Sequence, residues 1–142
     1  MQRTEQEQYV ELGIGNETYA IRIQDIHEII KMQDVTQIPN ALGYLKGVIN
    51  LRGRIIPVIS LRNMFGLMEE ENTKFTRIVV VNHVEDTVGV IVDRVNKVTN
   101  LSDIQPPPDR VGGISGNYFA GIGITDHGLV GILKLEEVLL RN

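Results

Sequence analysis

Short runs of branched apolar residues alternate with turn residues along most of the chain. The best-defined stretch covers residues 38–66, IPNALGYLKGVINLRGRIIPVISLRNMFG. Within it, residues 47–51 and 55–59 are apolar and rich in β-branched side chains, which favours strands. Arg52-Gly53 between them supplies a residue that can take positive φ, as tight hairpin turns require. The pattern therefore predicts a β-hairpin.

The end of this stretch predicts a helix that follows the hairpin. Pro57 has no N–H to donate to a neighbouring strand, so we expect it at a sheet edge or next to a β-bulge. Ser60 is a suitable helix N-cap, and apolar residues recur at helical spacing from Leu61 to Phe65. Gly66 is typical of the residue that ends a helix. The predicted unit is thus a hairpin with a short helix attached.

The rest of the chain shows the same alternation of apolar runs and turns. Asp25 and Glu28 have the spacing of a capping box, which predicts a short helical turn. Residues 104–116 contain three prolines and a Gly-Gly pair and predict an irregular loop. Residues 135–140 predict a closing helix. Further strands are predicted at residues 9–14, 18–23, 29–30, 35–38, 78–81, 88–92, 95–101, 120–124 and 129–133.

The two halves of the chain align with each other without gaps in two blocks. Residues 9–29 align with residues 78–98, and residues 47–65 align with residues 121–139. The spacing between aligned residues is 69 in the first block and 74 in the second, and the difference falls at the proline-rich loop. Either the fold is duplicated as two similar small barrels, or strand patterns coincide by chance.

Composition supports a strand-rich fold and excludes several classes of function. The 142 residues are 42% hydrophobic, include 14 glycines and lack Trp and Cys. They can bury one core or two small cores that share a face. A net charge of −4 argues against nucleic acid as the main ligand, because phosphate binding needs a basic surface. No apolar run reaches the roughly 20 residues of a membrane span and no signal sequence is present, so we expect a cytoplasmic protein.

Candidate catalytic residues are sparse. There is no phosphate-binding loop, and Gly121-Ile122-Gly123 lacks the third glycine of a dinucleotide fingerprint. His27, His83 and His127 are isolated, and without cysteine they do not have the spacing of a metal site. Asp93-Arg94 has no nucleophile beside it and is interpreted as a local ion pair or a capped turn. These residues therefore predict no metal site and offer no clear catalytic group.

Arg52 admits two interpretations. A guanidinium in a tight turn either reaches water or finds several acceptors. It is therefore either a plain turn residue beside Gly53, or it folds back onto a carboxylate such as Glu28 and fixes the junction of two barrels. Ile26 and Val95, which are equivalent in the repeat, are likewise either ordinary core residues or the lining of a groove between barrels.

The sequence motifs together resemble the CheW family of chemotaxis coupling proteins, over about residues 8–140. The combination is specific, although Asn-Leu-Arg-Gly alone would be weak. The resemblance rests on Pro39, GVINLRG at 47–53, PVISLR at 57–62, Phe65-Gly66, Tyr19-Ala20-Ile21, IHEI at 26–29, VGVIVDRV at 88–95, Gly121-Ile122-Gly123, Leu133 and Leu135.

The resemblance implies a mainly β fold with two SH3-like five-stranded β-barrels packed side by side, and short helices that include a C-terminal one. Residues 8–141 are then a single CheW-like domain. We expect its approximate halves to be a first barrel at residues 8–66 and a second at residues 75–141, with exchange of strands between halves allowed. Residues 1–7 are expected to form a flexible N-terminus.

The resemblance also implies a function without catalysis or cofactors. Family members link the cytoplasmic tip of methyl-accepting chemoreceptors to the regulatory domain of the CheA histidine kinase, and self-association in receptor arrays is possible for them. Matching positions place receptor binding at Ile23, Ile26, Glu28, Thr76, Arg77, Gly89 and Val95. Kinase binding falls on Val35, Thr36, Ile55 and Ile56, a second array contact on Arg110 and Val111, and a junction role on Arg52 and Gly53.

Two other functions are compatible with the sequence. The chain is alternatively the CheW-like module of a CheV-type regulator, although no acidic phosphorylation pocket follows the closing helix. A small ligand-binding barrel is the third candidate, and it would need convergent polar groups in addition to Asp93, Arg94 and Arg52.

Overall fold

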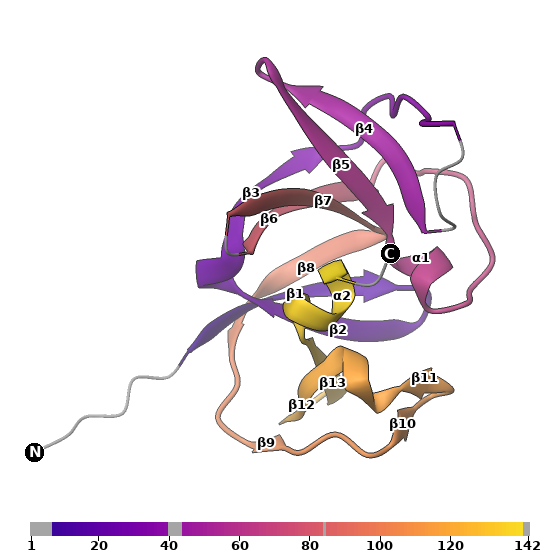
Figure 1. Cartoon of the computed structure of the whole chain (residues 1–142). Coiled ribbons are helices and arrows are strands. Elements are labelled where there is room, and N and C mark those ends of the chain that lie inside the picture. Colours follow the sequence, from indigo (N-terminus) through magenta and orange to yellow (C-terminus); the bar gives the residue numbers. More distant parts are fainter. Residues whose placement is uncertain (1–6, 40–43, 84, 141–142) are drawn as a thin grey trace, which may run out of the picture.

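The computed structural model describes residues 7–39, 44–83 and 85–140, which are mainly strands (Figure 1). Of the expected flexible N-terminus, residues 1–6 lie outside these ranges. The strands are β1 Gln8–Ile14, β2 Glu17–Arg22, β3 Ile26–Lys31, β4 Leu45–Leu51, β5 Arg54–Ser60, β6 Arg77–His83, β7 Asp86–Val92, β8 Arg94–Asn100, β9 Ile104–Gln105, β10 Arg110–Val111, β11 Ile114–Ser115, β12 Phe119–Thr125 and β13 Gly128–Leu133. The helical segments are η1 Ile23–Asp25, α1 Leu61–Met64, η2 Gly116–Tyr118 and α2 Leu135–Leu140.

The described strands form two main sheets and one small hairpin. The first, which we call sheet A, has the order β8-β1-β2-β13-β12-β9, and sheet B has the order β3-β6-β7-β5-β4. Strands β10 and β11 pair only with each other. This mainly β architecture with short helices confirms the predicted fold class.

Each sheet takes strands from both halves of the chain. The chain leaves sheet A after β2, crosses through η1 and enters sheet B at β3. It returns to sheet A between β7 and β8, where Asp93 is the single intervening residue. The sheets therefore do not follow the halves 8–66 and 75–141, and the exchange of strands that the sequence analysis allowed is present.

The internal repeat is confirmed by the register of the strands. The repeat relates β1, β2, β8, β12 and β13 to β6, β7, β3, β4 and β5, and the two sheets list these strands in the same order. The parallel pair Val58 and Gly89 of sheet B corresponds to Ile132 and Ala20 of sheet A, which also pair. The two sheets are thus related by a pseudo-twofold, with β9 represented in sheet B by one bridge at Thr36.

The largest core lies between the two sheets. Its buried side chains are Leu12, Ile14, Tyr19, Ile21, Ile59, Leu61, Val79, Val81, Val90, Val92, Phe119, Leu133, Leu135 and Val138. A smaller core belongs to sheet B and includes Ile49, Ile56 and Val58, and its counterpart in sheet A includes Val130 and Ile132. Alternate residues of each strand therefore face either the other sheet or the interior of their own.

The central hairpin and helix form as the sequence predicts. Arg52 and Gly53 have φ values of 51° and 90°, the positive pair that a two-residue hairpin turn requires. The Ser60 side chain caps α1 by accepting from the N–H of Asn63. Gly66, with φ of 77°, ends the helix, and the next N–H bonds back to the Arg62 carbonyl.

Three local predictions need correction. Pro57 is not at an edge, because β5 lies between β4 and β7. It pairs with Val48, and the register shift of β4 lies one pair further on, between Leu45 and Gly47. Asp25 ends η1 instead of capping a helix, since its carboxylate accepts from Arg22 and the branched residues that follow pair with β6. Residues 35–38 contribute only the Thr36 bridge to Val48.

Removing a buried side chain from the core between the sheets should destabilise the whole molecule. Leu12 is fully buried there, whereas Leu129 is 67% exposed. We expect Leu12→Ala to lower the free energy of unfolding by about 2 to 5 kcal/mol. Leu129→Ala should change it by less than about 0.5 kcal/mol. Urea denaturation measures both, and equal effects of the two variants would contradict this core assignment.

Candidate functional site

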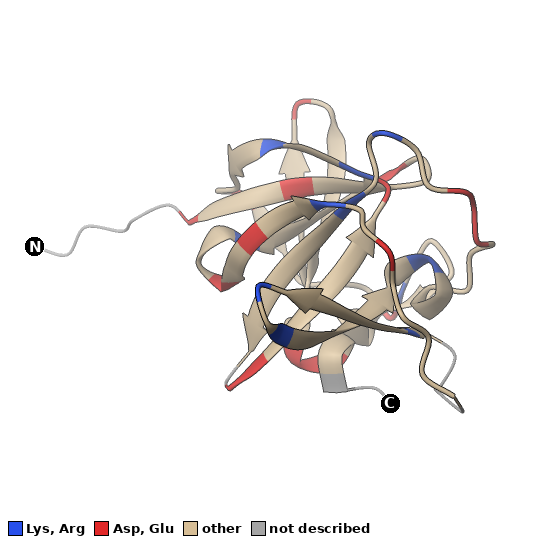
Figure 2. Cartoon of the chain, turned by 90° about the horizontal axis from the view of Figure 1, so that it is seen from above, with Lys and Arg blue, Asp and Glu red and all other residues tan. Residues whose placement is uncertain are grey.

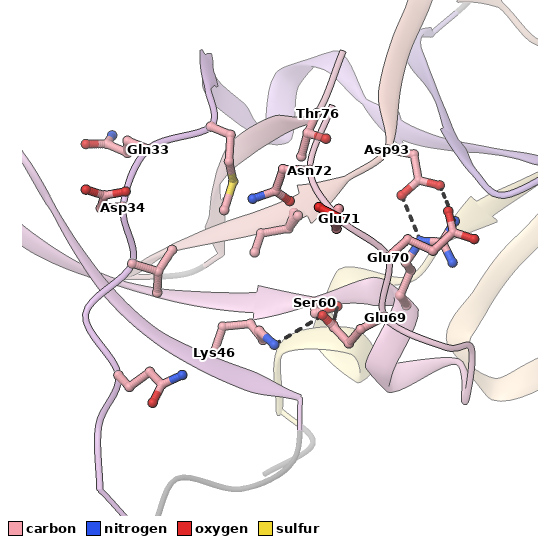
Figure 3. Close-up of a pocket in the computed structure, with 15 residues that line it drawn as sticks. Gln33, Asp34, Lys46, Ser60, Glu69, Glu70, Glu71, Asn72, Thr76 and Asp93 are labelled. Carbon is pink, nitrogen blue, oxygen red and sulfur yellow. Dashed lines mark hydrogen bonds and ion pairs between the residues drawn. The ribbon is translucent and has the colours of Figure 1, made fainter. Parts of the chain in front are cut away.

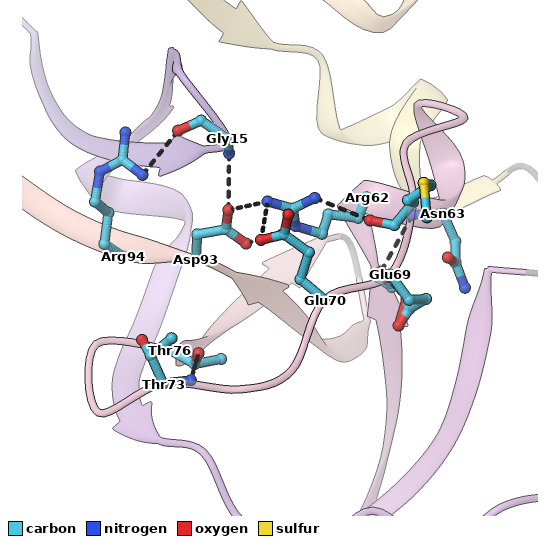
Figure 4. Close-up of polar contacts among 11 residues, drawn as sticks. Gly15, Arg62, Asn63, Glu69, Glu70, Thr73, Thr76, Asp93 and Arg94 are labelled. Carbon is cyan, nitrogen blue, oxygen red and sulfur yellow. Dashed lines mark hydrogen bonds and ion pairs between the residues drawn. The ribbon is translucent and has the colours of Figure 1, made fainter.

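A network of charged side chains closes the junction between the two sheets (Figure 4). Arg62, on α1, donates from Nε and Nη2 to the two carboxylate oxygens of Asp93 at 2.9 and 2.6 Å. Asp93 also accepts from the N–H of Gly15, in the β1–β2 turn, at 2.7 Å. Its own N–H donates to the Gly13 carbonyl. The residue that connects sheet B to sheet A is therefore held from both sides.

The arginine that follows Asp93 adds to this junction. Arg94 donates to the carbonyl of Gly15 at 2.9 Å. Its guanidinium lies over Gly13, where a Cβ atom would stand only 2.3 Å from the guanidinium carbon. Gly13 thus leaves room for the guanidinium of Arg94, which would have to move if a Cβ atom were added. Asp93-Arg94 is not the local ion pair that the sequence suggested, since the carboxylate of Asp93 pairs with Arg62.

The charge of Asp93 is stabilised by its partners. Burial alone would raise its pKa, but the hydrogen bonds from Arg62 and Gly15 and the positive charge of Arg94 together hold the pKa below the ordinary aspartate value. Charge-assisted, two-point Arg–carboxylate pairs have defined geometry as well as strength. The junction is thus fixed in orientation at this point.

The acidic segment after α1 is attached to the same arginine. Arg62 Nη1 donates to the Met68 carbonyl at 2.9 Å and Nη2 to Glu70 at 3.3 Å. Glu69 accepts from Lys46 and from the Ser60 hydroxyl, both at 3.2 Å. The segment borders a hollow of about 480 Å³ between residues 32–37 and the junction (Figure 3). The acidic segment is therefore held in place by hydrogen bonds to Glu69 and Glu70.

Arg52 does not bridge the two sheets. It pairs with Glu28 of β3, and both residues belong to sheet B. The hydrogen bond from Arg52 is the main cause that lowers the pKa of Glu28. Of the two interpretations, folding back onto Glu28 is thus confirmed, but the junction between barrels is held by Arg62 and Asp93 instead.

The expected receptor residues divide into exposed and buried groups. Ile26 and Val95 are half-buried against the core between the sheets, and Ile23 is exposed in η1. Glu28 and Gly89 lie opposite Val80 on neighbouring strands, so the fold brings them close together. Thr76 and Gly89 are buried, and Arg77 is half-buried.

The expected kinase residues lie at the outer part of sheet B. Ile55 is 64% exposed at the start of β5. Thr36 bridges to β4, and Val35 packs on the core of sheet B. Ile56 is buried in that core. Ile55 and Thr36 are therefore the positions best placed for an external contact, and the buried Ile56 supports them from beneath.

The expected second contact lies on β10, outside the two main sheets, beside an apolar groove over sheet A. Arg110 is exposed and donates to the Gly113 carbonyl at 2.6 Å, while Val111 lines the groove of about 610 Å³. Leu129 and Gln105 also line it, and they are the repeat equivalents of Ile55 and Thr36. The groove thus occupies the position in sheet A that the expected kinase patch occupies in sheet B.

Sequence reasoning missed the role of Arg62. Arg62 and Asp93 are 31 residues apart. Asp93 directly follows a predicted strand and Arg62 is the second residue after the predicted cap Ser60, and neither position alone indicates a pair. Basic and acidic positions are otherwise interspersed over the molecule (Figure 2).

Among the described residues, no three His, Cys, Asp or Glu side chains are placed to hold a metal ion. No helix in the described ranges is long and apolar enough to cross a membrane.

Two curved sheets with exposed apolar positions and a paired charge network define a strand-rich binding domain. A family model described as CheW-like domain matches residues 8–141. The chain therefore belongs to the CheW-like family.

Individual relatives agree with this assignment. Chemotaxis protein CheW of Helicobacter pylori is 39% identical over 95% of this chain and 82% of its own length. The protein of the same name from Treponema pallidum is 40% identical over 83% and 73%. The crystal structure of the scaffolding protein TtCheW from Thermoanaerobacter tengcongensis has a TM-score of 0.86 and 36% identity, over 94% of this chain and 87% of that one.

The Arg62–Asp93 pair should make the free energy of unfolding depend on pH in the acid range. A carboxylate whose pKa is lower in the folded than in the unfolded state stabilises the fold above the unfolded pKa, and this contribution is lost as pH falls through the folded pKa. Asp93→Asn should therefore be less stable than the parent at pH 7, and the gap should shrink below about pH 4. Urea unfolding at pH 7 and pH 3 measures it.

Asp126→Asn is the matched control, because Asp126 is an exposed turn residue. The difference in free energy of unfolding between Asp126→Asn and the parent should be small at pH 7 and at pH 3. A gap for Asp93→Asn that stays the same at pH 7 and pH 3 would contradict the assigned ion pair.

Proposed function

We propose that this chain is a non-enzymatic chemotaxis scaffold that couples the cytoplasmic tip of methyl-accepting chemoreceptors to the regulatory domain of the CheA histidine kinase. It would act at receptor arrays on the inner face of the membrane. Membership of the CheW-like family carries the proposal. The separation of exposed apolar positions onto different faces supports it, since a coupling protein needs two interfaces that are used at once.

The proposed receptor surface follows the junction between the sheets. A receptor helix would lie along half-buried Ile26 and Val95, with exposed Ile23 beside them. Glu28, held by Arg52, supplies a fixed charge next to this strip. Buried Thr76 and Gly89 would shape the floor and not contact the helix. An amphipathic helix in an apolar groove is a common mode of peptide recognition.

The proposed kinase surface is the patch of Ile55 and Thr36 on sheet B. Ile55 is 64% exposed and supplies the apolar contact that such an interface would bury. The second array contact would use the groove beside Val111 on sheet A. Because these two surfaces are related by the repeat, each is suited to a partner that itself has a CheW-like fold.

The other two candidates have weaker support. A CheV-type module would have the same fold, and only the full-length gene product distinguishes it. A ligand-binding barrel would use the groove of about 610 Å³, but its lining is mostly apolar and offers few convergent polar groups.

Co-sedimentation tests the proposal directly. Membranes that contain a chemoreceptor should carry this protein to the pellet, and they should carry the kinase regulatory domain only when this protein is present. Binding to neither partner would contradict the coupling role. A thermal shift with metabolites and no binding to either partner would favour the ligand-binding alternative.

A charge at Ile26 should selectively weaken receptor binding. Ile26→Glu places a carboxylate in the apolar strip, so we expect at least about a tenfold loss of receptor affinity, the equivalent of about 1.4 kcal/mol. Kinase affinity should stay within about threefold of the parent. Because Ile26 also touches the core, Ile23→Glu serves as a second variant at an exposed position. Normal receptor binding by both variants would show that the groove is misplaced.

A charge at Ile55 should have the opposite selectivity. Ile55→Asp is expected to reduce affinity for the kinase regulatory domain by at least about tenfold and to leave receptor binding unchanged. Met68→Asp, at an exposed apolar residue outside the proposed surfaces, is the matched control. If the two variants bind the isolated kinase domain equally well, sheet B does not carry the kinase surface.

A further inference from the structure

The chain crosses between the sheets twice, and the repeat makes the two crossovers equivalent. One crossover is Asp93, between β7 and β8, and the other is η1, between β2 and β3. The repeat places Gln24 at the position of Asp93. It also relates α1 to α2, so that Glu136 takes the position of Arg62 as the second residue of its helix. The pseudo-twofold thus supplies a direct comparison of the two junctions.

The Asp93 crossover is clamped. Arg62, whose side chain is only 14% exposed, makes two bonds to Asp93. The Gly15 N–H and the Asp93 N–H tie the crossover to the β1–β2 hairpin of sheet A. Figure 4 shows these partners converging on Asp93 from α1 and from the turn at Gly15. Both sheets are therefore connected to one carboxylate.

The η1 crossover has no such clamp. Among the described residues, the side chains of Gln24 and Glu136 make no hydrogen bond or ion pair with each other or with any neighbour. The nearby pair of Arg22 and Asp25 joins residues on the same crossover and does not connect the sheets. In place of a clamp there is a hollow of about 420 Å³, lined by residues that include Asp25, His83, Lys134 and Glu136.

We infer that the Arg62–Asp93 pair is the pivot that positions the two sheets, and that their relative movement occurs by opening and closing the hollow at the η1 crossover. The two sheets share one continuous apolar core, so small rotations are more accessible than separation. The two-point ion pair resists rotation of the sheets at the Asp93 crossover. Rotation is therefore expected at the η1 crossover, which has no such pair.

The pivot also supplies a mechanism for the proposed coupling of receptor to kinase. This functional part of the inference rests on the proposed function. The expected receptor positions Ile23 and Ile26 flank the unclamped crossover. A receptor helix that binds there would favour either the open or the closed form of the hollow at the η1 crossover. The expected kinase patch is on sheet B, so a change of angle between the sheets would alter the kinase's position relative to the receptor.

Spin labels test the pivot without any partner. The chain has no cysteine, so Lys31→Cys on sheet B and Lys97→Cys on sheet A supply two unique, exposed labelling sites. We expect electron–electron distance measurements to give a broader distribution when Arg62→Ala is added. Asp93→Asn should broaden it as well and serves as the second variant if Arg62→Ala does not fold.

The repeat also provides a gain-of-function variant. Gln24→Asp together with Glu136→Arg copies the Arg62–Asp93 pair onto the η1 crossover, and we expect it to narrow the distance distribution below that of the parent. Gln24→Asn with Glu136→Gln is the matched control without charge and should leave the width unchanged. An unchanged width in all folded Arg62 and Asp93 variants, or no narrowing by the copied pair, would overturn the inference.

A coupling assay separates this inference from the proposed function. The doubly clamped variant should bind receptor and kinase separately within about threefold of the parent, but should reduce receptor control of kinase activity by at least about fivefold. Full receptor control in this variant would overturn the role of the pivot in coupling. If the parent binds neither partner, the proposed function fails while the spin-label result still decides the pivot.

Discussion

Burial of the two sheets against each other is the constraint on which the rest of the structure depends. The largest core draws on both sheets, and each sheet is built from strands of both halves of the chain. Neither half of the chain therefore forms a complete sheet without the other half, and neither sheet has its core-facing apolar side covered without the other sheet. Apolar burial is strong but not directional, so the orientation of the sheets needs polar contacts such as Arg62 with Asp93.

The pseudo-twofold explains how one small fold presents several binding surfaces. Equivalent positions such as Ile55 and Leu129 are exposed and apolar on different sheets, and the sequence has diverged around them. The strip of Ile26 and Val95 lies at the junction itself, where the halves of the repeat meet. Duplication thus provides related surfaces, and under the proposed function their divergence would let each select a different partner.

The features that depend on neighbours in sequence could be predicted, and those that depend on distant contacts could not. The Arg52-Gly53 turn and the Ser60 cap need only adjacent residues, and both formed as predicted. The repeat was visible because it preserves strand spacing. The parallel pairing of β5 with β7, which exchanges strands between the halves, has no signature in the local sequence. Arg62 and Asp93 meet only after that exchange, so no local pattern predicts that they pair. The burial of Ile56 and Gly89 likewise follows from the packed sheet.

The central claim is that the junction between the sheets, with its pivot at Arg62 and Asp93, positions the proposed receptor and kinase surfaces relative to each other. The most direct measurement is the autophosphorylation rate of the kinase with receptor-containing membranes, with and without this protein. The account predicts that the membranes change the kinase rate only when this protein is present, and that a receptor ligand then alters the rate. A kinase rate that responds to the membranes equally well without the protein would contradict the account.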